Sequence, residues 1–321
     1  MCLSPQRLRC SVQAWSASWQ FATADGDATN PAASFVTKNM LEWLGERAAA
    51  SWNWVAIILF LALAAWEVAR PASKAQHGLG LRWLTNMSLH AANAALLLVL
   101  APGAVINSLM GHVGLTPTPF ALFGAVASDW LPLISGLMLL DFTAYAIHRM
   151  QHRFFVLWRF HAVHHADVDM DASTAFRHHP IEGLSIAMIG GTAFALLGPP
   201  EWIFPVYALI AIVSSLIQHA NVAMTGRIDS ALQWVLVTPA LHRIHHSVAV
   251  ADNEANFGMV LSIWDRMFGT YRREPESDRA AIKFGVASYT TPQFARPRWA
   301  WILPFAIRQS ATEVATLQSA D

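Results

Sequence analysis

The chain has few charged residues and almost no cysteine. Lys, Arg, Asp and Glu make up 13% of its 321 residues, whereas about 25% is usual in soluble domains. The two cysteines, Cys2 and Cys10, stand near the N-terminus, which excludes a disulfide framework or a thiolate metal site in the body of the chain. The 21 basic and 21 acidic residues balance, so no bulk positive charge attracts nucleic acid.

Apolar residues, in contrast, are abundant. They account for 55% of the chain, and the few charges cannot cover a soluble globule of this size. Apolar segments close to membrane length occupy residues 54–69, 83–101, 131–147, 181–197 and 202–217. The sequence therefore predicts an all-α, polytopic membrane bundle of about four to five spans, with Trp52 and Trp66 as interfacial anchors of the first span.

Lys and Arg in the loops indicate the orientation of these spans. Residues 102–130 contain no Lys or Arg, whereas four arginines lie in residues 149–180, and Arg70, Lys74 and Arg82 lie between the first two spans. Under the positive-inside rule the latter two loops are cytoplasmic. A turn at residues 198–201, "GPPE", joins spans four and five into a hairpin whose far ends return to the cytoplasmic side.

Histidines are concentrated on the predicted cytoplasmic side, at spacings that place them on one face of a helix. The motif H-x-x-H-H occurs twice, as "HAVHH" and "HRIHH", and "HRMQH" precedes them. Because residues three or four apart lie on one helix face, each motif presents imidazoles together, as a metal ion requires. Thr238 as N-cap and Pro239 at the first helical position predict a helix start before the second triplet.

Two isolated histidines join the candidate set, and four others do not. His179 opens the fourth span and His219 closes the fifth, both on the predicted cytoplasmic side. The remaining four fit no ligand spacing and are interpreted as structural or exposed: His77, His90, His112 and His178. The alternative for the whole set is solvated or hydrogen-bonded surface histidines, but the repeated motif far exceeds random placement.

The number of candidate histidine ligands indicates which metal the site would bind. Imidazole suits iron, zinc, copper and nickel, and eight to ten ligands imply two ions. Zinc sites usually take only three or four protein ligands, so the number favours redox iron while leaving a di-zinc hydrolase open. A metal transporter is the other alternative, although transporters place their ligands near the bilayer midplane, not at span ends and in loops.

The quoted motifs, with "RHHP", "QHAN" and "NFGMVLSIWDRMFGTY", resemble the fatty acid hydroxylase/sterol desaturase superfamily of integral membrane enzymes. The resemblance covers about residues 129–271. It implies a di-iron centre on the cytoplasmic face that hydroxylates or desaturates a lipid C–H bond with O2 and two electrons. No cytochrome b5-like domain is recognised, so the electrons are expected from a separate NAD(P)H-linked reductase. Three residues between the first two histidines match sterol desaturase-type members.

Carried over onto this chain, the resemblance implies ten iron ligands: His148, His152, His161, His164, His165, His179, His219, His242, His245 and His246. Asp141 and Tyr145 share one helical stripe with His148, and a ligating histidine usually donates its second N–H to a carboxylate or similar acceptor. Asp141, Tyr145 and Asn256 are therefore candidate catalytic residues, with Asp252 as a further candidate. Asp265 and Arg266 are expected to form a local ion pair.

Four regions follow from this interpretation. Residues 1–45 are expected to be a disordered N-terminal arm, with Met40 as an alternative start. Residues 46–128 form the N-terminal transmembrane region, and residues 129–272 the catalytic region with a cytoplasmic helical cap. Residues 273–321 form a C-terminal tail, in which residues 298–307, "RWAWILPFAI", are expected to lie at the membrane interface.

Overall fold

The computed structural model describes residues 31–75, 78–113, 131–224, 226–275, 282–286 and 289–308. In these ranges the chain forms helices and isolated β-bridges, without an extended strand. The long helices are α2 (Pro31–Ala69), α3 (Leu79–Leu100), α4 (Pro102–Val113), α6 (Leu131–Arg153), α8 (Pro180–Leu197) and α9 (Ile203–His219). The all-α prediction is confirmed.

Four helical stretches are long and apolar enough to cross a membrane: Asn39–Ala69, Leu79–Met110, Leu131–Arg153 and Pro180–Leu197. Helix α9, Ile203–His219, is apolar but shorter. The predicted number of about four to five spans is thus confirmed. Large apolar side chains on α2, such as Trp54 and Ile58, are 68% and 66% exposed, as expected of a surface that faces lipid.

The first helix is longer than predicted. Helix α2 begins at Pro31, inside the stretch of residues 1–45 expected to be disordered, and Met40 lies within it. Strong helix formers such as Leu41 and Ala48 explain the extension, and both are buried. A Cβ at Gly45 would lie 2.6 Å from Cβ of Trp202, so glycine allows α2 to approach the start of α9 closely. Residues 1–30 lie outside the described ranges.

The second span also continues further than predicted. Ala101 adopts a left-handed conformation with φ of 40°, and α4 then begins at Pro102, where proline is compatible with the first turn of a helix. Residues 102–113 of the predicted outer loop are therefore helical, and residues 114–130 lie outside the described ranges.

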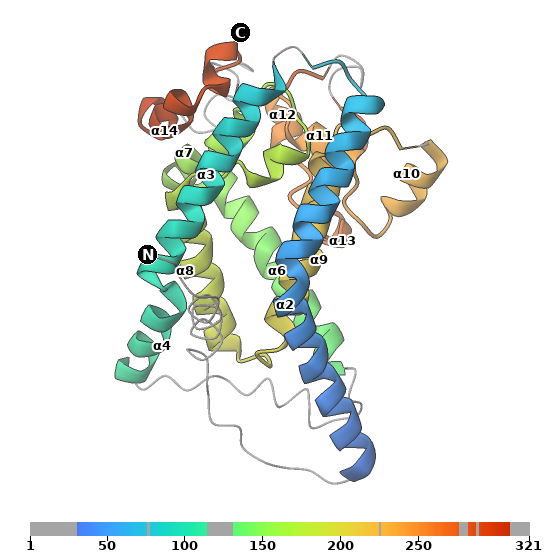
Figure 1. Cartoon of the computed structure of the whole chain (residues 1–321), viewed down its shortest axis with the longest axis vertical. Helices are drawn as coiled ribbons and strands as arrows, with labels where there is room; N and C mark the ends of the chain where they lie inside the picture. Colours follow the sequence, from blue (N-terminus) through green and yellow to red (C-terminus); the bar gives the residue numbers. More distant parts are fainter. Residues whose placement is uncertain are drawn as a thin grey trace, which may run out of the picture.

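The hairpin of α8 and α9 brings distant segments to one end of the bundle. Gly198 caps α8 with φ of 63°, and Pro199 and Pro200 follow. Helix α8 packs against α3 and α4, α9 packs against α2, and α6 contacts both α8 and α9, as Figure 1 shows. The first residue of α8 and the last residue of α9 consequently lie near the C-terminal end of α6.

Shorter helices gather around this end of α6, except α13, which lies further down (Figure 1). We call these shorter helices together the cap. They are α7 (Phe155–His165), η1 (Ala172–Phe176), α10 (Gly226–Leu232), α11 (Pro239–His245), α12 (Val250–Asn253), α13 (Ile263–Met267), η3 (Pro292–Ala295) and α14 (Pro297–Ala306).

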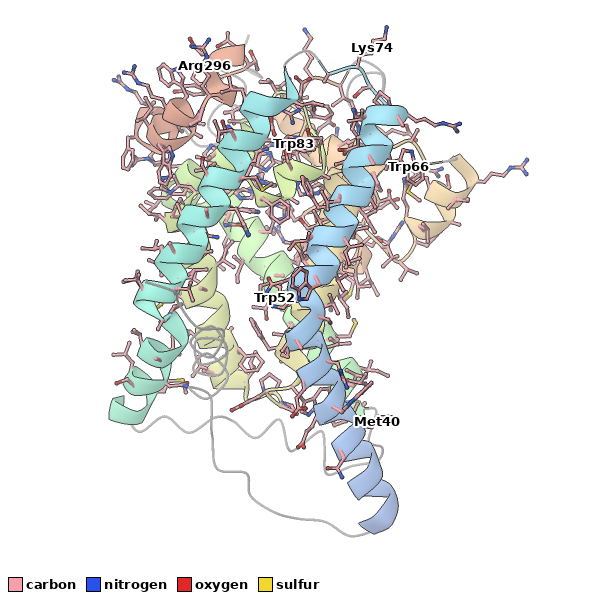
Figure 2. All side chains as sticks on the ribbon, in the orientation of Figure 1. Met40, Trp52, Trp66, Lys74, Trp83 and Arg296 are labelled. Atoms are coloured by element: carbon pink, nitrogen blue, oxygen red, sulfur yellow. The ribbon has the colours of Figure 1, made fainter. Side chains whose placement is uncertain are left out.

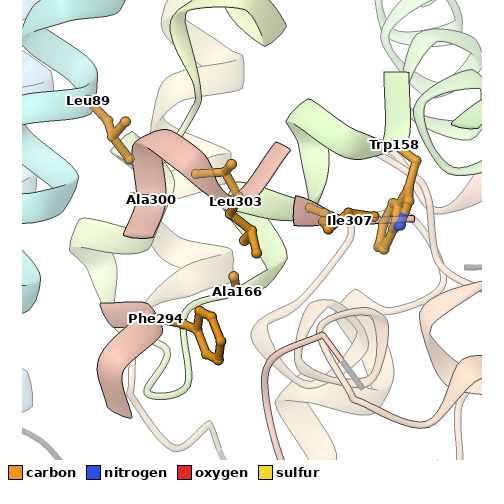
Figure 3. Close-up of a cluster of buried hydrophobic side chains, with 9 residues drawn as sticks. Leu89, Trp158, Ala166, Phe294, Ala300, Leu303 and Ile307 are labelled. Carbon is orange, nitrogen blue, oxygen red and sulfur yellow. The ribbon is translucent and has the colours of Figure 1, made fainter. Parts of the chain in front are cut away.

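Helix α14 covers one side of the cap. Leu303 and Ile307 are buried in a cluster with Trp158 of α7 and Leu89 of α3 (Figure 3). On its other side, Phe305 is 65% exposed. The predicted interfacial segment is thus a helix of ten residues with apolar side chains on its buried and exposed sides, too short to span a bilayer.

Two arginines counted for the orientation have a structural role. The Arg82 guanidinium donates to Asp167 at 2.9 and 3.1 Å and to Asp171 at 2.9 Å. Arg177 donates to the carbonyls of Val163 and Phe294 and to Asn86. Both arginines are fully buried and join the cap to α3. Because they are not solvated loop charges, they do not indicate which side of the membrane is cytoplasmic. Lys74 and Arg296 lie at the same end of the molecule as the cap (Figure 2), which keeps positive charge there.

Candidate metal centre

Four helices supply the histidines of the cap. His148 and His152 lie one turn apart at the C-terminal end of α6. After a break at Phe154, α7 carries the first H-x-x-H-H triplet, and α9 ends on His219. Pro239 begins α11 as predicted, although Thr238 makes no side-chain capping hydrogen bond. The second triplet ends this short helix.

Nine of the ten predicted ligands come together in two groups. The first group contains His148, His152, His161, His165 and His245; the second contains His164, His219, His242 and His246. In each group one nitrogen from every ring lies within 4.8 Å of the others, and all nine residues are buried. The groups adjoin, because the rings of His165 and His246 stack with centroids 4.4 Å apart.

The inner nitrogens are spaced as ligands of one ion are. In the second group Nε2 of His219 lies 2.9 Å from Nε2 of His242 and 3.1 Å from Nε2 of His164. In the first group Nε2 of His161 lies 3.1 Å from that of His148 and 3.2 Å from that of His165. With metal–imidazole bonds of about 2.0–2.1 Å, such spacings correspond to nitrogen–metal–nitrogen angles of roughly 90–105°.

The outer nitrogens of several rings meet acceptors that fix the tautomer. Nδ1–H of His148 donates to the carbonyl of Phe257 at 2.9 Å, and Nδ1–H of His245 donates to that of Ala255 at 2.7 Å. Nδ1–H of His219 donates to the carbonyl of Ser215 at 2.7 Å. Because a carbonyl only accepts, these Nδ1 atoms carry the proton and leave the Nε2 lone pairs facing inward.

The cap histidines are held in the neutral form that binds metals. Burial, reinforced by neighbouring imidazoles, lowers the pKa of His164, His165, His242 and His246 well below the ordinary value. Burial lowers the pKa of His245 to about 3. Among the described residues, Nε2 of His245 and both ring nitrogens of His152 have no hydrogen-bond partner. Inward lone pairs that accept no hydrogen bond are suited to bind divalent metal ions. The two histidine groups therefore fit two such ions.

Adjacent histidines before α8 have different environments. The ring of His178 stacks on His164, with centroids 4.6 Å apart and an angle of 10°. The ring of His179 lies instead between Phe160 and Trp301, and its Nδ1 accepts the backbone N–H of Ile181 as a helix cap. The structure therefore leaves the predicted ligand His179 outside both groups and brings His178, interpreted as structural or exposed, to their edge.

The predicted catalytic residues form their hydrogen bonds with groups other than the histidine rings. The Asp141 carboxylate accepts hydrogen bonds from Trp264, Tyr207 and two backbone N–H groups. The Tyr145 hydroxyl lies 3.1 Å from Oγ1 of Thr270. Asn256 has a φ of 56° and bonds to the backbone of Arg272 and Leu241. These residues hold the loop that follows α12. Asp252 pairs with Arg272.

The expected ion pair between Asp265 and Arg266 is wrong. The Asp265 carboxylate accepts the backbone N–H groups of Phe257 and Gly258 at 2.8 and 2.9 Å. The Arg266 guanidinium lies over the Trp234 and Tyr271 rings. Loop N–H groups that need an acceptor outcompete the neighbouring cation, which the sequence order alone does not reveal.

Sequence reasoning missed two carboxylates beside the groups. Glu182 accepts from Nδ1 of His161 at 2.7 Å and from Nδ1 of His178 at 3.0 Å. Oε1 of Glu254 lies 3.9 Å from Nδ1 of His152, and burial raises the pKa of Glu254 to about 7. A signal for Glu182 existed, because it is a carboxylate in the first turn of an apolar span, where charge is costly and tends to be functional.

The part of the chain that carries the histidine groups is similar to known proteins. The fatty acid hydroxylase family profile matches residues 133–270. An ornithine lipid hydroxylase from Rhizobium tropici is 34% identical over 51% of this chain and 50% of its own length. An alkylglycerol monooxygenase from Xenopus tropicalis is 32% identical over 46% of this chain and 31% of its own length. No solved structure matches the chain.

A more distant relative carries another printed activity. A very-long-chain aldehyde decarbonylase from Oryza sativa is 27% identical over 42% of this chain and 52% of its own length. The chain thus spans about half or less of the length of these curated relatives. The range that the family profile matches, residues 133–270, includes both histidine groups. The match over residues 133–270 supports the predicted resemblance to the fatty acid hydroxylase superfamily.

Proposed function

We propose that this chain is a membrane-bound di-iron oxygenase that hydroxylates a lipid C–H bond with O2 and two electrons from a separate NAD(P)H-linked reductase. The observation that carries the proposal is the pair of adjoining histidine groups at the end of the membrane helices. The overall reaction balances as RH + O2 + 2 electrons + 2 protons giving ROH + H2O. Hydroxylation is favoured over desaturation because the more similar relatives are named hydroxylase and monooxygenase.

The composition of the first group favours iron over zinc. It offers five imidazoles, whereas zinc sites normally take three or four protein ligands in tetrahedral geometry. Imidazole nitrogens suit iron. The four histidines of the second group would hold the other ion. Two irons in such a pair supply the oxidising chemistry that side chains lack.

The chain's own residues position and shield the proposed ligands. Glu182 orients His161, and the carbonyls of Phe257 and Ala255 orient His148 and His245. The Phe257 ring lies against His148, His152 and His245, with centroids 5.7, 5.0 and 5.6 Å away. Phe257 is 2% exposed, so it keeps water from one side of the first group.

A lipid substrate follows from the location and from the relatives. The groups lie at the ends of α6 and α9, where a lipid can enter from the bilayer and a reductase can dock from the cytoplasm. The relatives named above act on an ornithine lipid and on alkylglycerols, according to their names. We propose a polar membrane lipid as the substrate class and the cytoplasmic leaflet as its source.

Metal analysis of the purified protein tests the proposal. We expect about two irons per chain, and restoration of lipid hydroxylation when iron(II), but not zinc, is returned to the metal-free protein together with O2 and a reductant. Two bound zinc ions with no iron, and no oxygen-dependent product, would support the di-zinc hydrolase instead. Metal uptake into proteoliposomes without lipid oxidation would support a transporter.

A further inference from the structure

Asp141 lies near the middle of a membrane span. It follows the first residue of α6, Leu131, by ten positions and precedes the last, Arg153, by twelve. At 1.5 Å per residue these intervals are about 15 and 18 Å. The hydrocarbon core of a bilayer is about 30 Å thick, so groups bound to Asp141 lie well below the end of α6 that carries His148 and His152.

The segment that leads into α13 is bound at this depth. The Asp141 carboxylate accepts the backbone N–H groups of Val260 and Leu261, both at 3.1 Å, and the indole N–H of Trp264 at 2.9 Å. Figure 1 accordingly shows α13 far below α11 and α12. In the same orientation, Figure 2 shows Trp66 of α2 above that level and Trp52 below it.

A turn after α10 is joined to α13 and lies beside it. The backbone N–H of Ser262 donates to the carbonyl of Val235 at 3.0 Å, and its hydroxyl donates to the carbonyl of Gln233 at 2.7 Å. An isolated bridge pairs Leu236 with Leu261. We call residues 233–236 together with α13 and Phe268 the α10–α13 wedge.

The outer face of the wedge is apolar. Trp234 and Val235 of the turn are 70% and 58% exposed, and Met267 and Phe268 are 63% and 44% exposed. Phe268 stacks on Phe142 and Tyr145 of α6, with centroids 5.8 and 5.5 Å away. The face is therefore continuous with the surface of a membrane span. An apolar surface of this kind on the outside of a protein marks an interaction site.

The charged side chains of the wedge have partners within the protein. The Arg266 guanidinium lies 3.7 Å from the Tyr271 ring centroid and 4.7 Å from that of Trp234, and it donates to the carbonyl of Gln233. Asp265 is 1% exposed. Non-helical backbone is tolerated at membrane depth only where protein groups satisfy it, and Asp141 and Asp265 do so here.

We propose that the outer face of the α10–α13 wedge lies against lipid acyl chains, so this part of the catalytic region is embedded in the cytoplasmic leaflet. The occupant is lipid because of the depth set by Asp141, the apolar exposed side chains and the continuity with α6. One consequence is that only Tyr145 and Phe257 separate Phe268 from the histidines along this aromatic row, with centroids 5.5 and 6.4 Å apart.

Spin labels on single cysteines test this placement in the full-length protein. Cys2 and Cys10 are replaced by serine, and Val235→Cys or Met267→Cys is labelled after reconstitution into lipid nanodiscs. Collision rates are measured with O2, which concentrates in the hydrocarbon, and with a water-soluble nickel chelate. Ile58→Cys on the exposed face of α2 is the lipid control, and Lys74→Cys in the following loop is the water control.

We expect both wedge labels to match Ile58→Cys, with high O2 and low nickel collision rates. Nickel collision equal to that at Lys74→Cys would overturn the proposal, because the wedge would then lie in water. Low collision with both reagents would also overturn it, because a protein surface would then cover the wedge. The two positions lie on separate elements, so if one variant fails to fold the other decides.

Discussion

Nδ1 of His161 lies 2.7 Å from Oε1 of Glu182, a fully buried contact between the first histidine group and the start of α8. Since the carboxylate accepts the Nδ1 proton, Nε2 of His161 is left to face the other ligands. Hydrogen bonds from outer acceptors to metal-binding histidines typically change metal affinity or activity by 10–100-fold. The same oxygen accepts from His178, so Glu182 also connects His161 to the ring stacked on His164 of the second group.

Glu182→Ala should therefore weaken iron retention and lower turnover by about 10–100-fold. The measurement is iron per chain after dialysis against a chelator, with turnover assayed on the same sample. Glu46→Gln, which changes an exposed carboxylate on α2, is the control and should behave as wild type. A Glu182→Ala protein that keeps both its iron and its turnover would show that this hydrogen bond does not position His161.

The neighbours His178 and His179 allow a matched comparison. His178→Ala removes the ring stacked on His164 and should reduce turnover. His179→Asn keeps a side-chain acceptor at the start of α8 and should retain both metals and nearly full turnover, because His179 lies outside both groups. Metal content and turnover of the two variants give the answer. A larger loss of metal and turnover in His179→Asn than in His178→Ala would return His179 to the ligand set.

Asp141→Asn should destabilise the protein. The carboxylate accepts four hydrogen bonds, and an amide oxygen cannot replace both carboxylate oxygens as acceptors. Hydrogen bonds to charged groups contribute roughly 1.5–3 kcal/mol each, so a loss of about 3 kcal/mol is expected. Thermal unfolding in detergent measures it. Unchanged Tm would contradict the role of Asp141 in holding residues 257–264 against α6, and a loss of turnover without any change in stability would favour a direct catalytic role.

The metal-free protein should lose stability in acid. The folded pKa of His245 is about 3, below the ordinary unfolded value of about 6.5, so between these values the unfolded chain binds more protons than the folded one. Stability should thus fall as the pH decreases below about 6.5. Four further cap histidines shift in the same direction.

Glu254 acts in the opposite direction. Its pKa is raised to about 7 in the folded state, so the folded chain binds a proton at a higher pH than the unfolded chain does. This group therefore adds stability as the pH decreases. The five histidines should outweigh it. The measurement is Tm of metal-free protein between pH 8 and pH 5. A constant or rising Tm toward pH 5 would contradict the buried, neutral state of these rings.

The sequence predicted the parts of the centre that depend on local helical spacing. His161, His164 and His165 had to share a face once they were helical, and the same holds for His148 with His152. The sequence did not distinguish His178 from His179, because adjacent residues at a helix start point in different directions and tertiary packing decides which ring faces inward. Spacing alone did not reveal that Glu182 would meet His161.

Long-range contacts explain the remaining differences. Arg82 and Arg177 were interpreted as loop charges, yet Arg82 pairs with Asp167, 85 positions along the chain. Asp141 shares a helical stripe with His148, which suggested a contact with that ring. Three of its four hydrogen-bond partners come from residues 260–264, more than a hundred positions away, and the fourth is Tyr207. These contacts depend on how distant segments pack together, which a local sequence pattern does not encode.

Oxygen-isotope transfer into lipid is the most direct test of the central claim. Cell membranes containing the iron-loaded protein and its reductase are incubated under 18O2, and lipid products are compared by mass spectrometry with those from His245→Ala and His242→Ala, one variant for each histidine group. We predict one 18O atom in a lipid hydroxyl with the wild-type protein and none with either variant. Lipid modification without 18O, or full incorporation by both variants, would contradict a di-iron oxygenase built on these two groups.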